Sequence, residues 1–72
     1  MKLNYYTETD SLYIDLSSSP SVNSVEISEG IVVDYDAKGK ITGIDIDHAS
    51  ENIDLAELTT SHLPVAKQAM ST

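Results

Sequence analysis

Acidic residues in the middle of the chain have a spacing that could bind calcium. Asp34 and Asp36 have the spacing of the first two ligands of an EF-hand loop, and Gly39 and Ile41 match its glycine and its apolar residue. Asp45 stands where the loop usually has its last ligand, a glutamate. Lys38, however, stands where a third oxygen ligand belongs, and the flanking residues alternate as strands rather than helices. A tight turn explains the same residues, so the sequence does not favour a metal site here.

A broader group of carboxylates shares one side of the predicted strands. Asp15, Asp34 and Asp45, with Asp47 as a further candidate, alternate with apolar residues and therefore face away from the core. Like charges on neighbouring strands destabilise a sheet, so some compensation is expected. The group could be a solvated face that discourages aggregation, a docking surface for a basic protein, or a weak site for divalent cations. The predicted interaction surface comprises Tyr13, Asp15, Val32, Asp34 and Asp45.

The two histidines give little support to catalysis. His48 follows Asp47 and could form a histidine–carboxylate pair, the beginning of a small hydrolase site. A nucleophile would have to be oriented by the same base, and no serine lies in a recognisable elbow or triad context. His62 precedes Leu63-Pro64 and is typical of a helix end. We therefore predict no catalytic residue, no cofactor and no bound metal.

One hairpin is the clearest structural element. Residues 31–35 and 44–46 alternate apolar and polar side chains, the period with which a strand presents one face to a core. Asp36-Ala37-Lys38-Gly39 between them is typical of a type I turn closed by a glycine with positive φ. Ile41 is out of phase with Ile44, and a bulge near Gly43 would reconcile the two.

The rest of the chain predicts a small sheet and a helix. Residues 2–6, 12–16 and 25–27 alternate as strands, with polar turns or Pro20 between them. Asp54 followed by Glu57 fits a variant capping box, with Leu55 and Leu58 as a buried stripe. The expected fold is one α+β domain over residues 1–72: a meander-like antiparallel sheet of four to five strands at about 2–47, with a C-terminal helical segment at about 51–70 packed on one face.

Composition excludes several classes of function. The 72 residues carry twelve acidic side chains against four lysines and no arginine, a formal net charge of −8. This balance argues against binding nucleic acid or anionic membrane. Without cysteine, so small a domain has neither disulfides nor thiolate-bound zinc, and we expect a homodimer instead. The N-terminus lacks the apolar core of a signal peptide, so we expect a cytoplasmic protein.

Two segments resemble a known family. The run from Tyr5 to Ile14, with Asp10 and Leu12-Tyr13-Ile14, resembles the opening of a family of small prokaryotic proteins catalogued as domain of unknown function 2283. Its second half is similar to Gly30–Asp36, Gly39, Gly43–Ile46 and Ala49-Ser50. The sequence departs from it at Tyr6, where the family tends to have Asp, and at Asp47-His48, where it tends to have Leu-Asp. The resemblance implies a small α+β fold without an established activity. Some relatives lie beside genes for toxin-like ribonucleases, which implies an antitoxin-type role.

Together these observations predict a non-enzymatic interaction module. We expect it to self-associate and to present its acidic side to a basic protein, as an antitoxin-like protein would. The alternatives from other classes are a weak divalent-cation-binding domain and a small hydrolase that uses His48 and an aspartate.

Overall fold

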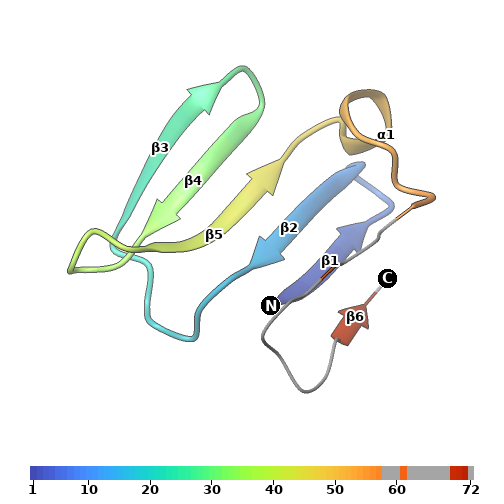
Figure 1. The fold of residues 1–72 in the computed structure, drawn as a ribbon. Helices are drawn as coiled ribbons and strands as arrows, with labels where there is room; N and C mark the ends of the chain where they lie inside the picture. Colours follow the sequence, from blue (N-terminus) through green and yellow to red (C-terminus); the bar gives the residue numbers. More distant parts are fainter. Residues whose placement is uncertain (58–60, 62–68, 72) are drawn as a thin grey trace.

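The computed structural model describes residues 1–57, 61 and 69–71 of the chain, and Figure 1 shows their arrangement. Six strands form one sheet in the order β3-β4-β5-β2-β1-β6. Neighbouring strands are antiparallel, except that β6 runs parallel to β1. The elements are β1 (Lys2–Tyr6), β2 (Ser11–Asp15), β3 (Asn23–Ser28), β4 (Ile31–Tyr35), β5 (Ile41–Ile46), α1 (Ala49–Asn52) and β6 (Ala69–Ser71).

The first five strands and the helix confirm the predicted α+β fold class. β1 and β2 form one hairpin, and β3, β4 and β5 form a meander. The two parts join where β2 pairs with β5, so residues 16–22 cross the ends of β5 and β4 before β3 begins (Figure 1). Within the described residues, no helix is long and apolar enough to cross a membrane.

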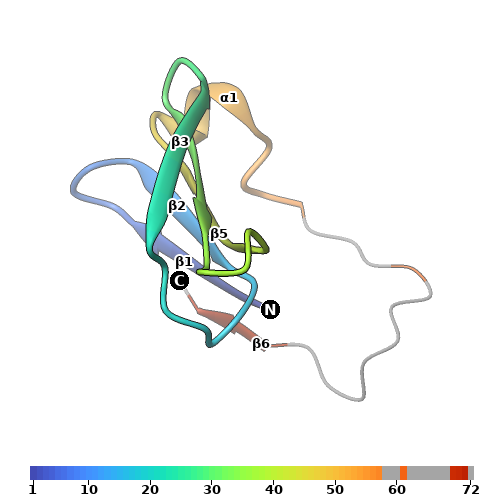
Figure 2. The same ribbon diagram turned by 90° about the vertical axis from the view of Figure 1, so that its left-hand side faces the viewer.

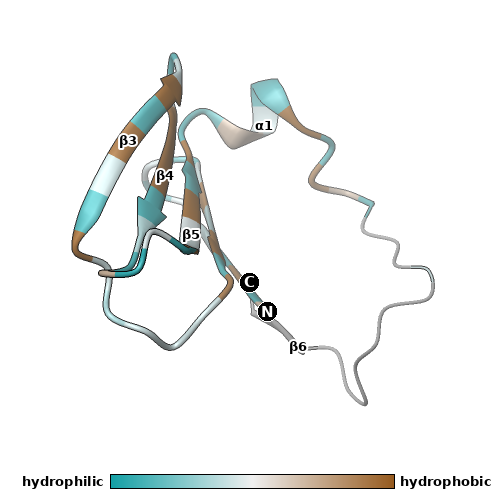
Figure 3. Cartoon of the chain, turned by 60° about the vertical axis from the view of Figure 1, so that its left-hand side comes forward, coloured by the Kyte–Doolittle hydropathy of each residue, from teal (hydrophilic) through white to brown (hydrophobic). Residues whose placement is uncertain are grey.

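Alternating side chains give the sheet one apolar face. Hydrophobic residues lie directly opposite one another on neighbouring strands, as in the register Leu3–Ile14–Ile44–Val33–Val25. Figure 3 shows this alternation as brown and teal bands along β3. Leu12, Ile46 and the fully buried Ala49 of α1 form the core cluster, against which Leu3, Tyr5, Ile14 and Ile44 pack. The core is therefore small and lies where α1 meets β2 and β5.

The turn between β4 and β5 has the predicted geometry. Gly39 has φ 81°, which a glycine adopts without steric cost, and its N–H donates to the carbonyl of Asp36 at 3.0 Å. The Asp36 carboxylate accepts hydrogen bonds from the backbone N–H groups of Lys38 and Lys40, both at 2.9 Å. Asp36 thus stabilises the turn itself.

A bulge interrupts β5 close to the expected place. Asp34 lies opposite Gly43 and Tyr35 lies opposite Ile41, so Thr42 has no partner residue on β4. Thr42 is 2% exposed, and its Oγ1 lies 2.7 Å from the Ser21 hydroxyl. The extra residue explains why Ile41 is out of phase with Ile44.

The helix that the structure describes, α1, begins earlier than expected, at Ala49. α1 consists of four residues directly after the turn that follows β5. The helix expected to start at Asp54 does not start there, because the Asp54 carboxylate accepts a hydrogen bond from the N–H of Ala56 within a local turn. Leu55 is 40% exposed rather than buried. Residues 58–60 and 62–68 of the expected helical segment, with Leu58 and His62 among them, lie outside the described residues.

The turn between β1 and β2 holds α1 in place. Asp10 accepts hydrogen bonds from the Tyr5 hydroxyl at 2.6 Å, the Ser50 hydroxyl at 2.6 Å and the Ser50 N–H at 3.1 Å. The N–H of Ala49 donates to the Asp10 carbonyl at 2.9 Å. Groups at the start of a helix lack partners inside it, and Asp10 supplies them from a distant segment. We call Tyr5, Asp10 and Ser50 the Asp10 clamp.

The Asp10 clamp predicts a specific loss of stability in acid. The hydrogen bonds from Ser50, and then from Tyr5, lower the pKa of Asp10 below its ordinary value of 3.8. Because the folded pKa is the lower one, the stabilisation is present above 3.8 and is lost as pH falls through the folded value. Asp10→Asn should therefore lower the urea midpoint at pH 7 and flatten its decline in acid.

Urea unfolding followed by circular dichroism across this pH range measures the effect. Tyr5→Phe removes one of the three side-chain and backbone donors to the carboxylate, so its effect should be smaller than that of Asp10→Asn. Glu8→Gln, an exposed neutralisation in the same turn, is the control and should leave the midpoint nearly unchanged. An Asp10→Asn variant with the wild-type acid profile would contradict the clamp.

Candidate functional site

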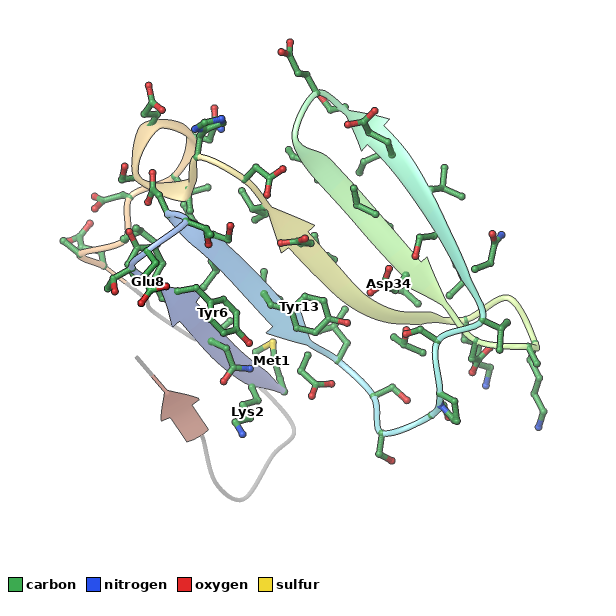
Figure 4. The ribbon with its side chains drawn as sticks, turned by 180° about the vertical axis from the view of Figure 1, so that it is seen from behind. Met1, Lys2, Tyr6, Glu8, Tyr13 and Asp34 are labelled. Atoms are coloured by element: carbon green, nitrogen blue, oxygen red, sulfur yellow. The ribbon has the colours of Figure 1, made fainter. Side chains whose placement is uncertain are left out.

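The structure brings the five predicted surface residues together on the face opposite the core. In one row across β2, β5 and β4, Asp45 lies between Tyr13 and Val32. In the next row, Gly43 lies between Asp15 and Asp34. All five side chains are half-buried in this layer rather than fully exposed. Figure 4 shows this face, with Tyr13 extending from β2 toward Asp34 on β4. We call Tyr13, Asp15, Val32, Asp34 and Asp45 the acidic face.

A chain of hydrogen bonds crosses four adjacent strands of this face. The Tyr13 hydroxyl on β2 reaches over β5 and donates to Asp34 Oδ2 at 2.9 Å. The Ser24 hydroxyl on β3 donates to Asp34 Oδ1 at 2.6 Å. Because both carboxylate oxygens accept a hydrogen bond, the orientation of Asp34 is fixed within the sheet.

Gly43 makes room for the tyrosine ring. A Cβ atom at this position would overlap the hydroxyl oxygen of Tyr13 and lie 2.5 Å from its Cζ. Glycine within a strand often marks a place where another group approaches closely. The sequence predicted a bulge near Gly43, and the structure places it at Thr42. Gly43 has a separate role, because the Tyr13 ring packs directly against it.

The charges of the acidic face are not neutralised within the part of the chain that the structure describes. The one ion pair found there joins His48 and Glu51. Lys2 lies opposite Asp15 in the β1–β2 register but forms no ion pair with it. Burial, followed by the charges of Asp47 and Asp34, raises the pKa of Asp45. Burial, followed by the hydrogen bond to Asp34, raises the pKa of Tyr13. The face thus favours a cationic neighbour.

The calcium-like spacing does not produce a metal site in the fold. Asp36 caps the hairpin turn, and both oxygens of Asp34 accept hydrogen bonds from Tyr13 and Ser24. Over residues 1–57, 61 and 69–71, no group of three or more acidic, histidine or cysteine side chains could hold a metal ion. The spacing of Asp34, Asp36 and Asp45 therefore follows from the hairpin and its turn.

His48 lies on the surface beside Glu51. Its side chain is 73% exposed, and its Nδ1 lies 3.4 Å from a carboxylate oxygen of Glu51. Two open hollows on the surface are lined by other segments, one by Tyr5–Thr9 and the other by residues between Ser17 and Ile41. His48 therefore pairs with Glu51 on the exposed surface, and this geometry gives the hydrolase hypothesis no support.

Sequence reasoning missed both side-chain networks. Tyr5 and Asp10 appear in the sequence only as parts of the opening motif, and nothing there indicates their hydrogen bond. Tyr13 and Asp34 were assigned to the same face, but their contact depends on the intervening glycine. A tyrosine and an aspartate on one face with a glycine on the strand between them is the signal that could have revealed the second network.

The packing of Tyr13 on Gly43 predicts strong coupling between the two positions. Gly43→Ala should lower the free energy of unfolding by about 1–3 kcal/mol, because the new methyl group forces the ring away from Asp34. In a Tyr13→Ala background the same change should cost much less, leaving a coupling energy of at least about 1 kcal/mol. Urea unfolding of the wild type, both single variants and the double variant measures this. Equal costs of Gly43→Ala in the two backgrounds would rule out the proposed contact.

Comparison with known proteins places these networks in a family. Neither the curated proteins nor the solved structures provide a match. A family model described as "Protein of unknown function (DUF2283)" matches residues 2–50. This range covers β1 to β5 and the first residues of α1, and so contains the whole Asp10 clamp and the whole acidic face. Since the match spans more than half of the sequence, the chain belongs to the DUF2283 family, as its motifs indicated.

Proposed function

We propose that this protein is a non-enzymatic interaction module whose acidic face binds a basic protein. The observation that carries the proposal is the arrangement of Asp15, Asp34 and Asp45 in two adjacent rows around Tyr13 and Val32. A half-buried aromatic residue and an apolar residue surrounded by charge are typical of protein interfaces. An antitoxin-like role toward a basic toxin is one form of this function.

The electrostatics of Asp45 support a cationic partner. Burial, followed by the charges of Asp47 and Asp34, disfavours the ionised form of this carboxylate and raises its pKa. A lysine or arginine placed beside it would stabilise the ionised form and lower its pKa. The free protein therefore carries an electrostatic cost that a basic partner would remove.

The hydrogen-bond chain supports a preorganised surface. Tyr13 and Asp34 are held by each other, by Ser24 and by the close contact with Gly43. Side chains that are already ordered lose less conformational entropy when a partner binds. A fixed tyrosine ring and a fixed carboxylate are thus suited to recognise a basic side chain.

The proposal predicts opposite effects on stability and binding for one variant. Asp15→Asn/Asp45→Asn should bind a labelled oligo-arginine peptide about fivefold more weakly than the wild type, an effect that decreases with added salt. The same variant should be at least as stable at pH 7. Because the pKa of Asp45 is raised in the folded protein, this residue contributes to folding stability at low pH, and that contribution is lost as pH rises through the folded pKa. At pH 7 its removal should therefore not lower the free energy of unfolding.

Fluorescence anisotropy for binding and urea unfolding for stability measure the two effects. Glu8→Gln/Glu29→Gln is the matched control, since it removes the same charge from exposed turn positions. If the control loses as much affinity as the test variant, the peptide responds to net charge alone, and the acidic face is not the binding surface.

We also propose that two copies associate through the apolar face. A sheet with one apolar face is stable when a second layer covers that face. Among the described residues, the element packed there is α1, which lies at one end of the sheet (Figure 2). Val25 on this face and Leu16, which continues the alternation of β2, remain 43% and 39% exposed. A second copy would bury them.

Self-association predicts a dimer that charge can disrupt. Leu16→Lys/Val25→Lys should shift the protein from dimer to monomer in sedimentation velocity, because burying unpaired ammonium groups is unfavourable. Tyr6→Lys/Val22→Lys is the matched control: both side chains are exposed, Tyr6 alternates away from the apolar face, and Val22 lies outside the strands, before β3. A wild-type protein that stays monomeric at high micromolar concentration would refute the dimer.

A further inference from the structure

We propose that an extended basic segment of the partner pairs with the free edge of β3 and adds one strand to the sheet. This inference rests on the proposed function, since it specifies how the basic partner reaches the acidic face. Among residues 1–57, 61 and 69–71, β3 is the last strand on its side of the sheet and pairs with β4 alone. All six of its residues are exposed.

The edge offers a regular stretch of backbone for pairing. Asn23 to Glu26 follow an unbroken register with Tyr35 to Val32, and the register shifts only after Glu26. The N–H and C=O groups of such a strand that point away from its neighbour form a template for another strand. Four residues of β3 are therefore suitably placed for strand addition.

β3 lacks the side chains that commonly prevent such pairing. Natural edge strands carry lysine or proline, whereas β3 contains neither, and its one charge is Glu26. Val25 and Ile27 are 43% and 60% exposed. At the opposite edge the last described strand is β6, which has only three residues.

The side chains beside this edge specify the partner sequence. A residue opposite Val25 would lie on the apolar face, and residues opposite Ser24 and Glu26 would lie on the acidic face. Glu26 is exposed, and its contact with the N–H of Gly30 is long, at 3.4 Å. Ser24 is small, so a lysine or arginine could extend over it toward Asp34, about 10 Å away at two strand spacings. The best match alternates basic and apolar residues.

Charge favours this partner over a second copy. Pairing of two β3 strands would bring together two edges that each carry Glu26 and no basic residue. A basic strand would instead meet Glu26 at the edge and Asp34 one strand further in.

The test uses capped peptides of alternating lysine and valine. Hydrogen exchange followed by NMR should show new protection at alternate backbone amides of Asn23–Glu26 when the peptide binds. Successive N–H groups of a strand point to opposite edges. Two further peptides, one methylated at the N–H groups of all valines and one at those of all lysines, should therefore differ: the peptide whose methylated groups face β3 should not bind, and the other should bind. Glu26→Lys should weaken binding about fivefold, whereas its control Glu29→Lys, in the adjacent turn, should weaken it less.

The outcomes separate this inference from the proposed function. If Asp15→Asn/Asp45→Asn weakens binding but the β3 amides stay unprotected and both methylated peptides bind, the acidic face stands and strand addition is overturned. If a peptide with the same residues in block order binds equally well and protects no amide, strand addition is likewise overturned. Protection of the β3 amides in the free protein at concentrations where it dimerises would show that a second copy occupies the edge.

Discussion

The register between β4 and β5 is the constraint on which the rest of the structure depends. Side chains alternate between the two faces of a strand, so a shift of one residue would move every apolar side chain of β5 to the wrong face. The extra residue Thr42 absorbs this shift before Gly43. Ile44 and Ile46 can then join the core while Gly43 lies opposite Asp34. The same register that builds the core therefore also places the glycine beneath Tyr13.

Two hydrogen-bond networks, one at the end of the sheet and one on its acidic face, give the family motifs a physical role. Asp10, from the opening motif, accepts hydrogen bonds from Tyr5 of the same motif and from Ser50 of the closing one. Tyr13, from the opening motif, lies on Gly43 and binds Asp34, from the second half. Each network joins residues far apart in the sequence. Many of the residues that carry the family resemblance are thus explained by the need to hold the sheet and α1 together, without reference to catalysis.

The acidic face combines a structural role with an electrostatic cost. Asp34 contributes to the sheet through two hydrogen bonds, whereas Asp45 has a raised pKa and no basic neighbour among the described residues. Ionisable groups with shifted pKa values are common at functional sites, so Asp45 is a candidate for a functional residue. β3 contains neither lysine nor proline, the residues with which monomeric sheet proteins usually prevent pairing at an edge strand. This edge is therefore a second candidate for function.

The amino-acid sequence determined the local structure. Alternation specified the strands, the Asp36–Gly39 turn specified the hairpin, and the phase of Ile41 revealed the bulge, because each depends on residues within a few positions of one another. Alternation also assigned all five residues of the acidic face to one side of the sheet. The helix start predicted at Asp54 was wrong, because the capping pattern there also fits a simple turn. Which strands became neighbours was decided only by the tertiary structure. The contacts of Tyr13 with Asp34 and of Asp10 with Ser50 depend on strand order, and pairing across a sheet joins residues whose separation no local pattern records.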